Sequence, residues 1–280
     1  MASKKSSSGL LLVAPTLLIV LIFGIYPVIV LIATSFGLGE VGAYENPGPT
    51  LQYYGEFVGS ERLTKSIINS LIIGLGSVII TLVASIPTVL YLAKKARTGT
   101  STKYTDALIT FPITLPGIII GFFAIVLTGR TGLLGEVIPF LKGAAFGYLG
   151  LMIAYIYFSI PRIVSPLRGA ADLIDPELED TAHSLGASKA RVFFTVTLPL
   201  ILPAAIEVSG TAAAVALGGY GTVAALSEGI RLLPLDVVDA LNNGYYIATS
   251  SAFAVVLALL AIGALAAGKL CAHLVERKMG

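Results

Sequence analysis

The sequence predicts an all-α, polytopic membrane protein with about six transmembrane helices. Hydrophobic residues make up 56% of the 280 residues, charged residues only 12%, and the mean hydropathy is +0.90. Soluble domains carry about 25% charged residues, so the bilayer is the expected solvent. The apolar runs lack strict period-2 alternation. Because backbone groups in lipid must be satisfied internally, these runs are expected to be helices rather than barrel strands.

Six apolar runs are long enough to cross a hydrocarbon core of roughly 30 Å at about 1.5 Å per residue. They are Leu10–Phe36, Ser66–Ala93, Ala107–Thr128, Ala144–Pro161, Leu198–Leu217 and Ile247–Cys271. The first follows Lys4 and Lys5, as a secretory signal would, but it is far longer than the roughly 7–15 residues of a signal core. We therefore expect a retained first span, bent or ended near Pro15 and Pro27.

The basic residues predict the orientation of these spans. If both termini lie on the same side, five of the 18 Lys and Arg residues fall on the opposite side and the other thirteen on the side of the termini. The five are Arg62, Lys65, Arg130, Lys142 and Arg231. Because cytoplasmic loops are enriched in Lys and Arg, both termini are predicted to be cytoplasmic, in the plasma (inner) membrane.

A polar segment of residues 170–199, which we call the elbow, separates the fourth and fifth runs. Asp175 is expected to cap a short helix, with Pro176 at its first position. This helix would run to Leu185 and end at Gly186 in a left-handed conformation.

A second helix is expected to follow at once. Ser188 is its expected cap, and it would run from Lys189 to about Leu198. Pro199 and Pro203 are then expected to kink the entry into the fifth span. The tip between the two helices carries few bulky side chains, which suits insertion into a partner's groove.

The elbow resembles the EAA loop of inner-membrane permeases of binding-protein-dependent ABC importers. That loop has Glu-Ala-Ala, three residues, Gly, and later an aliphatic residue, one further residue, Leu and Pro. Here Asp180-Thr181-Ala182 precedes Gly186 at this spacing, and Val196 to Pro199 supplies the closing element. Asp replaces Glu, and Thr replaces the first Ala. The alternative is a solvated amphipathic connector without a partner.

The resemblance implies the type I importer permease fold and several partners. Residues 1–65 would form the first transmembrane helix and an outer loop, and residues 66–275 the core permease domain. Two ATP-binding subunits would dock on the elbows of this chain and of a second permease subunit, identical or homologous. An extracytoplasmic solute-binding protein would deliver the solute, and lipid would surround the spans. The implied coupling residues are Glu179, Asp180, Thr181, Ala182, Leu185, Gly186, Ala187, Ser188 and Pro199.

The solute is a separate question. Ala216-Leu-Gly-Gly-Tyr-Gly221 is similar to an Ala-Leu-Gly-Glu-Phe-Gly element of polyamine, sulfate and iron permeases, with Gly219 where those often have Glu. This similarity, with further resemblance to polyamine permeases in the first span and in the Phe111 to Gly117 segment, implies a polyamine-like cation as the solute. Iron, thiamine, phosphonate and an oxyanion remain alternatives.

Four polar residues are candidates for the translocation path: Glu207, Thr211, Asn69 and Thr114. Glu207 is the only acidic side chain inside the expected spans. A central carboxylate costs about 2.5–3.5 kcal/mol to insert, so it would mark the path or a gate. The alternative is that the Glu207 carboxylate pairs with a basic group or stays hydrated near the cytoplasmic side.

Other features argue against enzymatic, metal-binding or nucleic-acid-binding roles. Gly263 to Leu270 nearly matches a phosphate-binding loop, but Leu270 replaces the Ser or Thr and an uninterrupted helix is expected there. No cofactor or metal site is expected from His183 and His273, and Cys271 is expected to be a buried, inert thiol. The net charge of +2 gives no support for nucleic-acid binding.

One packing question stays open at the level of sequence, and two rival function classes are disfavoured. Gly117 and Gly121 have the spacing for close helix packing, within the subunit or across a dimer. An ion-driven secondary transporter would want buried ion-coupling groups and internal repeats, and an intramembrane enzyme would want paired acids or a nucleophile with a base. Neither pattern is found in the sequence, and this chain is expected to catalyse no reaction.

Overall fold

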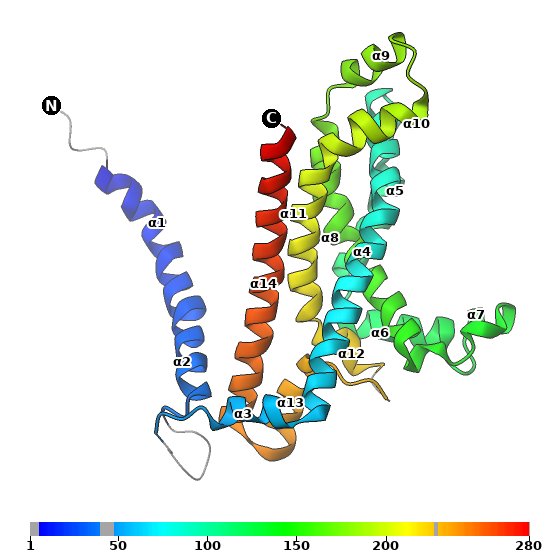
Figure 1. Ribbon diagram of the computed structural model, residues 1–280. Coiled ribbons are helices and arrows are strands. Elements are labelled where there is room, and N and C mark those ends of the chain that lie inside the picture. Colours follow the sequence, from blue (N-terminus) through cyan, green and yellow to red (C-terminus); the bar gives the residue numbers. More distant parts are fainter. Residues whose placement is uncertain (1–5, 40–47, 227–228, 280) are drawn as a thin grey trace. The chain divides into compact units, whose positions relative to one another are not determined.

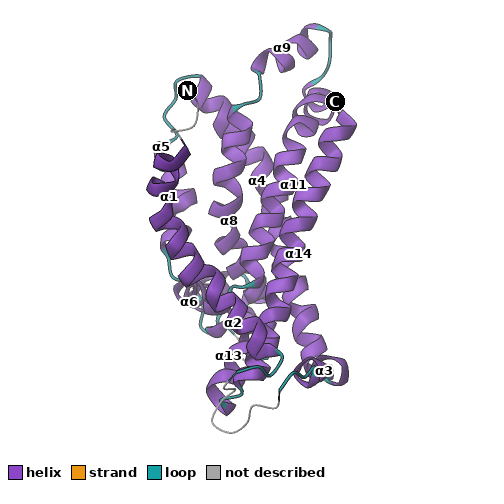
Figure 2. Cartoon of the chain, turned by 90° about the vertical axis from the view of Figure 1, so that its left-hand side faces the viewer, coloured by secondary structure: helices purple, strands orange, loops and turns teal. Residues whose placement is uncertain are grey.

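A computed structural model of the chain describes residues 6–39, 48–226 and 229–279, and every regular element in these ranges is helical (Figures 1 and 2). The α-helices are α1 Ser6–Val20, α2 Tyr26–Ser35, α3 Gln52–Gly59, α4 Glu61–Arg97, α5 Lys103–Thr110, α6 Gly117–Thr128, α7 Leu133–Val137, α8 Tyr148–Asp172, α9 Pro176–Ser184, α10 Lys189–Val192, α11 Leu198–Leu217, α12 Tyr220–Ala224, α13 Leu233–Gly244 and α14 Ile247–Met279. The shorter segments are the π-helices η1 Leu21–Ile25 and η5 Phe193–Thr197, and the 3₁₀ turns η2 Phe111–Thr114, η3 Pro139–Leu141 and η4 Ala144–Phe146.

Six helical segments are long and apolar enough to span a membrane, which confirms the predicted fold class. They are Leu12–Ser35, Glu61–Arg97, Gly117–Val137, Tyr148–Asp172, Lys189–Leu217 and Ile247–Lys278. Most of these segments are longer than the apolar runs, because the helix continues for one or more turns of polar residues beyond the hydrophobic stretch. The fourth differs most: it was expected to end at Pro161, yet α8 contains both Pro161 and Pro166 and runs on to Asp172.

The third apolar run is not one helix, which corrects the expectation for Ala107–Thr128. α5 ends at Thr110, η2 follows, and Leu115 is extended, with φ −90° and ψ 132°, before α6 begins at Gly117. The cause is local. Pro112 and Pro116 each lack an N–H, and Leu115 is disfavoured in the α conformation because it precedes Pro116.

Two prolines are accommodated by π-helical turns rather than by chain breaks. Pro27 lies two residues after the end of η1, and Pro199 lies two residues after the end of η5. A proline ring would clash with the carbonyl four residues earlier, and the wider π turn relieves that clash. Pro15, by contrast, lies inside α1 and does not end it.

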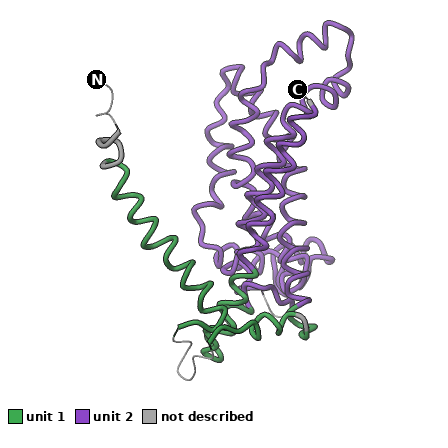
Figure 3. Tube along the Cα trace, turned by 60° about the vertical axis from the view of Figure 1, so that its left-hand side comes forward, with its two compact units in different colours: residues 1–63, 236–256 green, residues 64–235, 257–280 purple. Residues whose placement is uncertain are grey.

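The chain divides into two compact units, coloured separately in Figure 3. Unit 1 comprises residues 1–63 and 236–256, and unit 2 comprises residues 64–235 and 257–280. Within unit 1, Arg62 donates to the fully buried Asp236 at 2.8 Å. The rings of Phe57 and Phe253 pack edge to face at 4.8 Å. Residues 236–256, which the sequence analysis places in the core permease domain, cluster with unit 1. The division of the chain at residue 65 stays a prediction.

The core of unit 2 is built around α8, which packs against α6 and α11. Tyr155, Ile163 and Leu167 of α8 are fully buried, together with Ile201 of α11. Glycines let backbones approach closely: a β-carbon on Gly210 of α11 would lie 2.8 Å from the α-carbon of Gly268 in α14. Small residues at crossings are the usual means of close helix packing in membranes.

The open question about Gly117 and Gly121 is resolved in favour of packing within the subunit. A β-carbon on Gly121 would lie 2.6 Å from the β-carbon of Ala225, and one on Gly117 would lie 3.1 Å from the backbone nitrogen of Thr222. Both glycines therefore face α12 of the same chain.

Two further expectations concern α14. The near-match from Gly263 to Leu270 lies inside this uninterrupted helix, as expected, and so lacks the loop that would cradle a phosphate. Cys271 is exposed, which corrects the expectation of a buried thiol. The apolar sequence around Cys271 misled the prediction, because in a membrane helix apolar residues also cover the outward-facing side.

Candidate functional site: the elbow and the path residues

The elbow folds as its sequence predicts. The Asp175 carboxylate accepts a hydrogen bond from the Glu177 N–H at 2.9 Å and caps α9, and Pro176 occupies the first helical position. The Ser188 hydroxyl oxygen accepts from the Arg191 N–H at 3.4 Å and caps α10. Figure 1 shows α9 and α10 at the same end of the molecule as the C-terminal end of α14.

The tip of the elbow is a glycine-dependent helix C-cap. Gly186 has φ +85°, and its N–H donates to the His183 carbonyl at 2.9 Å. The Ala187 N–H donates to the Ala182 carbonyl at 3.1 Å. These two bonds are those of a Schellman motif, which favours glycine because other residues are strained at positive φ. Leu185 is held outward at this turn and is 84% exposed.

The base of the elbow is tied to α4. The Arg97 guanidinium donates to the carbonyls of Ala171, at 3.0 Å, and of Asp172 and Ile174. These carbonyls lie at and just beyond the C-terminal end of α8, where helix carbonyls lack partners and the dipole favours a cation. Arg97 therefore fixes the point at which the elbow leaves the helix bundle.

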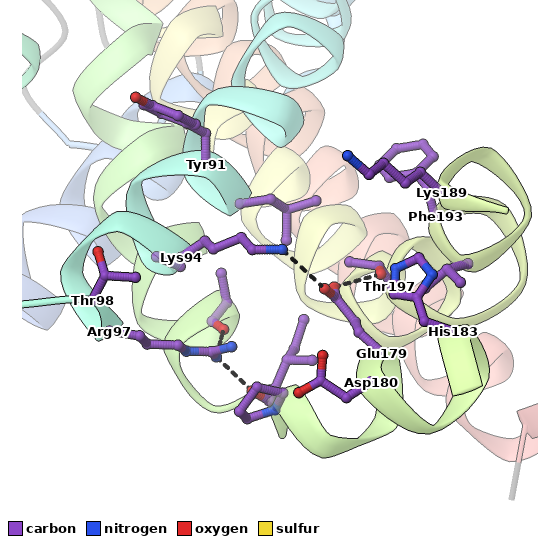
Figure 4. A pocket seen from close by; sticks show the side chains of 16 residues that line it. Tyr91, Lys94, Arg97, Thr98, Glu179, Asp180, His183, Lys189, Phe193 and Thr197 are labelled. Carbon is purple, nitrogen blue, oxygen red and sulfur yellow. Dashed lines mark hydrogen bonds and ion pairs between the residues drawn. The ribbon is translucent and has the colours of Figure 1, made fainter. Parts of the chain in front are cut away.

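Glu179 points back toward the bundle rather than away from it (Figure 4). Its Oε1 accepts a hydrogen bond from the Thr197 hydroxyl at 2.8 Å, and its Oε2 lies 4.0 Å from the Lys94 Nζ. These contacts join α9 to η5 and to the end of α4 across a cavity of about 490 Å³. The Glu179 side chain is 29% exposed, whereas that of Lys94 is 78% exposed.

Most of the implied coupling residues lie together on the elbow, at the surface. Asp180, Thr181, Leu185, Gly186 and Ser188 are exposed, while Ala182 and Ala187 are half-buried. Glu179 and Pro199 stand apart, because the first bonds to Thr197 and the second begins α11. Sequence reasoning missed Lys94, Arg97 and Thr197. No local pattern could have found them, since their contacts join segments far apart in the chain.

The four path candidates are only partly brought together. Glu207 and Thr211 are both exposed, one turn apart on α11, and the Thr211 hydroxyl donates to the Glu207 carbonyl at 3.3 Å. Asn69 is held elsewhere: its Oδ1 accepts from the Tyr148 hydroxyl at 2.7 Å, and its Nδ2 donates to the Arg231 carbonyl at 3.0 Å. Thr114 is exposed at the break before α6 and donates to the Phe111 carbonyl at 2.7 Å.

Comparison with known proteins adds independent findings. The family model described as "Binding-protein-dependent transport system inner membrane component" matches residues 85–279. The molybdenum transport system permease protein ModB of Escherichia coli K12 is 38% identical over 118 residues, which cover 41% of this chain and 52% of that protein. The chain thus spans about half the length of this relative. ModB of Mycobacterium tuberculosis is 32% identical over 67% of this chain and 73% of that protein.

A third relative and two solved structures extend the comparison. The sulfate transport system permease protein CysT of a Synechocystis species is 29% identical over 56% of this chain and 57% of that protein. A bacterial alginate ABC transporter, solved with an alginate-bound periplasmic protein, contains a chain of the same fold, with TM-score 0.74, 16% identity and coverage of 96% and 93%. The MetNI methionine ABC transporter gives TM-score 0.59 and 18% identity over 77% of this chain and 99% of that one.

Proposed function

We propose, from the premise that the chain belongs to the family of binding-protein-dependent transport system inner membrane components, that it is the permease subunit of an ATP-driven oxyanion importer. Membership of this family makes it a multi-pass inner-membrane protein of a transport family rather than of an enzyme family. The observation that carries the coupling role is the exposed, glycine-capped tip of the elbow. It presents Leu185 and small residues on a rigid turn.

The proposed partners follow from this role. Two ATP-binding subunits dock on the elbows of this chain and of a second permease, identical or homologous, and carry out the ATP hydrolysis. A solute-binding protein delivers the solute from the other side of the membrane. Closure of the ATP-binding subunits moves the elbows together, and because Arg97 and Glu179 tie the elbow to α4 and η5, that movement reaches the spans. The result is alternating access by rigid-body motion.

An oxyanion of the molybdate and sulfate class is the proposed solute. The relatives at 29–38% identity transport molybdenum or sulfate by their names. They do not support the polyamine-like cation expected from the sequence, and they favour the oxyanion alternative instead. The Ala216–Gly221 element behind the cation expectation is similar to an element of sulfate and iron permeases as well as of polyamine permeases, and therefore discriminates poorly.

The path is proposed to run along the exposed face of α11 that carries Thr211, and Glu207 on the same face, whose carboxylate would repel an oxyanion, is not proposed to bind the solute. An acid at membrane depth is costly against lipid, so this face is better suited to a water-filled path or to the second permease. An ion-driven secondary transporter is disfavoured, because the family is described by its dependence on a binding protein.

The test is reconstitution with ATP-binding subunits, comparing Gly186→Val with the wild type. At φ +85° a β-branched residue is strained by about 1–3 kcal/mol, which should distort the tip. We expect loss of the bound ATP-binding subunit and of ATP-dependent molybdate uptake into vesicles.

The matched control is Gly99→Val. Gly99 also has positive φ, +74°, and open space around its α-carbon, but it lies between α4 and α5. This variant should keep both the bound subunit and uptake. Normal docking by Gly186→Val, or equal loss in both variants, would contradict the coupling role of the tip.

A further inference from the structure

The segment Gly117–Val137 is interrupted by the non-helical residues 129–132, where Arg130 lies, so we take α6 alone as the part that crosses the membrane. α6 then begins inside the membrane rather than at its surface. It has 12 residues and so a length of about 18 Å, against roughly 30 Å for a hydrocarbon core. Arg130 follows its C-terminal end and marks one membrane face. The opposite end, at Gly117, therefore lies beyond the middle of the span, preceded by the extended Leu115 and Pro116. Non-helical backbone at this depth is tolerated where protein covers it or where it lines a water-filled path.

The first turn of α6 offers unused hydrogen-bond donors. The Ile119 N–H donates to the Pro116 carbonyl at 2.9 Å. Across the described part of the chain, no acceptor meets the N–H groups of Gly117 or Ile118. Free N–H groups and the helix dipole together place a partial positive charge of about half a unit at this end. Helix N-termini within the membrane face anionic groups in several transporter folds.

A second, independent observation lies beside this helix end. Thr222 of α12 is 2% exposed, and its hydroxyl has no hydrogen-bond partner among the described residues. The hydroxyl is close to the start of α6, because a β-carbon on Gly117 would lie 3.1 Å from both the Thr222 nitrogen and its Oγ1. A buried hydroxyl left unpaired costs about 1–3 kcal/mol, so the absent partner needs an explanation.

Glycines keep these donors uncovered by side chains. Gly117 has no side chain, and a β-carbon on Gly221 would lie 3.2 Å from the Ile118 nitrogen. The segment before α12 is held in place by Tyr155, whose fully buried hydroxyl donates to the Gly219 carbonyl at 3.2 Å. α12 itself packs against α6. The fold thus packs the start of α12, with the Thr222 hydroxyl, directly against the first turn of α6.

We infer that the N-terminus of α6 and the Thr222 hydroxyl form an oxyanion-binding position within the transport path. This inference rests on the oxyanion solute of the proposed function and adds the place at which the solute is held. A tetrahedral oxyanion accepts hydrogen bonds at every oxygen and so suits a site made only of donors. Thr222 is covered in this conformation, so the position is closed here and becomes reachable when α12 and α6 separate during the cycle.

The test is Thr222→Val in the complete transporter, reconstituted in vesicles and supplied with saturating binding protein. Val preserves the shape but removes the donor. With one charge-assisted hydrogen bond lost, molybdate uptake should fall about tenfold, while ATP-binding subunit content and thermal stability stay at wild-type values. Thr222→Ser restores the hydroxyl and should return uptake to within about twofold of the wild type. If the Val variant fails to assemble, Thr222→Ala, which cannot clash, replaces it with the same expectation.

The matched control is Thr128→Val, at a buried threonine of α6 whose hydroxyl already bonds to the Ala124 carbonyl at 2.9 Å. It should leave uptake unchanged. Wild-type uptake of molybdate with equal uptake by Thr222→Val would overturn the site and leave the proposed function standing. A wild-type complex that hydrolyses ATP but imports neither molybdate nor sulfate would instead overturn the proposed solute. A fall in uptake that Ser fails to rescue would show a packing role and also overturn the site.

Discussion

At the scale of single residues, Glu179 and Asp180 show how neighbouring acids acquire different surroundings. The sequence groups both with the coupling residues, because both fall on the motif. In the structure Asp180 is exposed on the elbow, whereas Glu179 turns inward to Thr197 and Lys94. Consecutive residues lie 100° apart around a helix, which is enough to separate an exposed side chain from one that contacts η5 and α4.

This difference predicts a separation of effects. Glu179→Ala should leave ATP-binding subunits bound and hydrolysing ATP but lower uptake per ATP several-fold, because the elbow then moves without pulling on η5. Glu179→Gln keeps an acceptor oxygen for Thr197 and should retain most of the coupling. The measurement is the ratio of molybdate taken up to ATP hydrolysed in vesicles.

Two comparisons test that interpretation. Thr197→Val should reproduce Glu179→Ala, and the double variant should be no worse than either single one, as expected for a shared contact. Asp180→Ala should weaken binding of the ATP-binding subunit instead. If Glu179→Ala behaves like Asp180→Ala, Glu179 contacts the partner and does not brace the elbow.

At the scale of elements, helix ends and crossings are set by small residues and prolines. Prolines break the third run at Phe111–Pro116, yet Pro27 and Pro199 are absorbed by π turns, and Pro161 and Pro166 lie within α8. The sequence therefore predicts that a proline perturbs a membrane helix. It does not predict whether the helix breaks, forms a π turn or continues. The outcome depends on what packs against the freed backbone groups.

The crossing of α11 and α14 gives a prediction at this scale. A β-carbon on Gly268 would lie 2.6 Å from the Gly210 α-carbon, whereas Gly263, on the same helix, has open space. Gly268→Val should therefore destabilise the protein by about 1–3 kcal/mol or more through overpacking. Gly263→Val should change stability little.

The measurement is the midpoint of thermal unfolding of the purified protein in detergent, for both variants and the wild type. Because the two substitutions are chemically identical and only five residues apart, a difference between them reports the crossing itself. Equal midpoints for the two variants would show that the helices can separate at no cost.

At the scale of the whole molecule, the side of the membrane on which the elbow lies decides whether it can bind a soluble ATP-binding subunit. The excess of Lys and Arg predicts that the elbow and both termini face the cytoplasm. Within unit 2, the elbow and the last turns of α14 lie at the same end, as both views show (Figures 1 and 2).

Cysteine labelling tests this orientation directly, because Cys271 is the sole cysteine. In a Cys271→Ser background, Ser184→Cys on the exposed elbow should react with a membrane-impermeant maleimide only in inside-out vesicles. Thr131→Cys, exposed after α6, should react only from the opposite side. Labelling of Ser184→Cys in intact cells would reverse the topology and remove the docking role.

The sequence by itself determined the number of spans, the caps of the elbow and the resemblance to importer permeases. These depend on hydrophobic length, on cap chemistry at Asp175 and Ser188, and on the positive φ that a glycine adopts without strain at position 186, all of which are local. Only the tertiary structure decided which side chains meet. Three contacts join segments that are distant in the chain: Glu179 with Thr197, Arg97 with the carbonyls at the end of α8, and Thr222 with the start of α6. Such contacts arise from packing between helices, and helical periodicity within one segment carries no information about them.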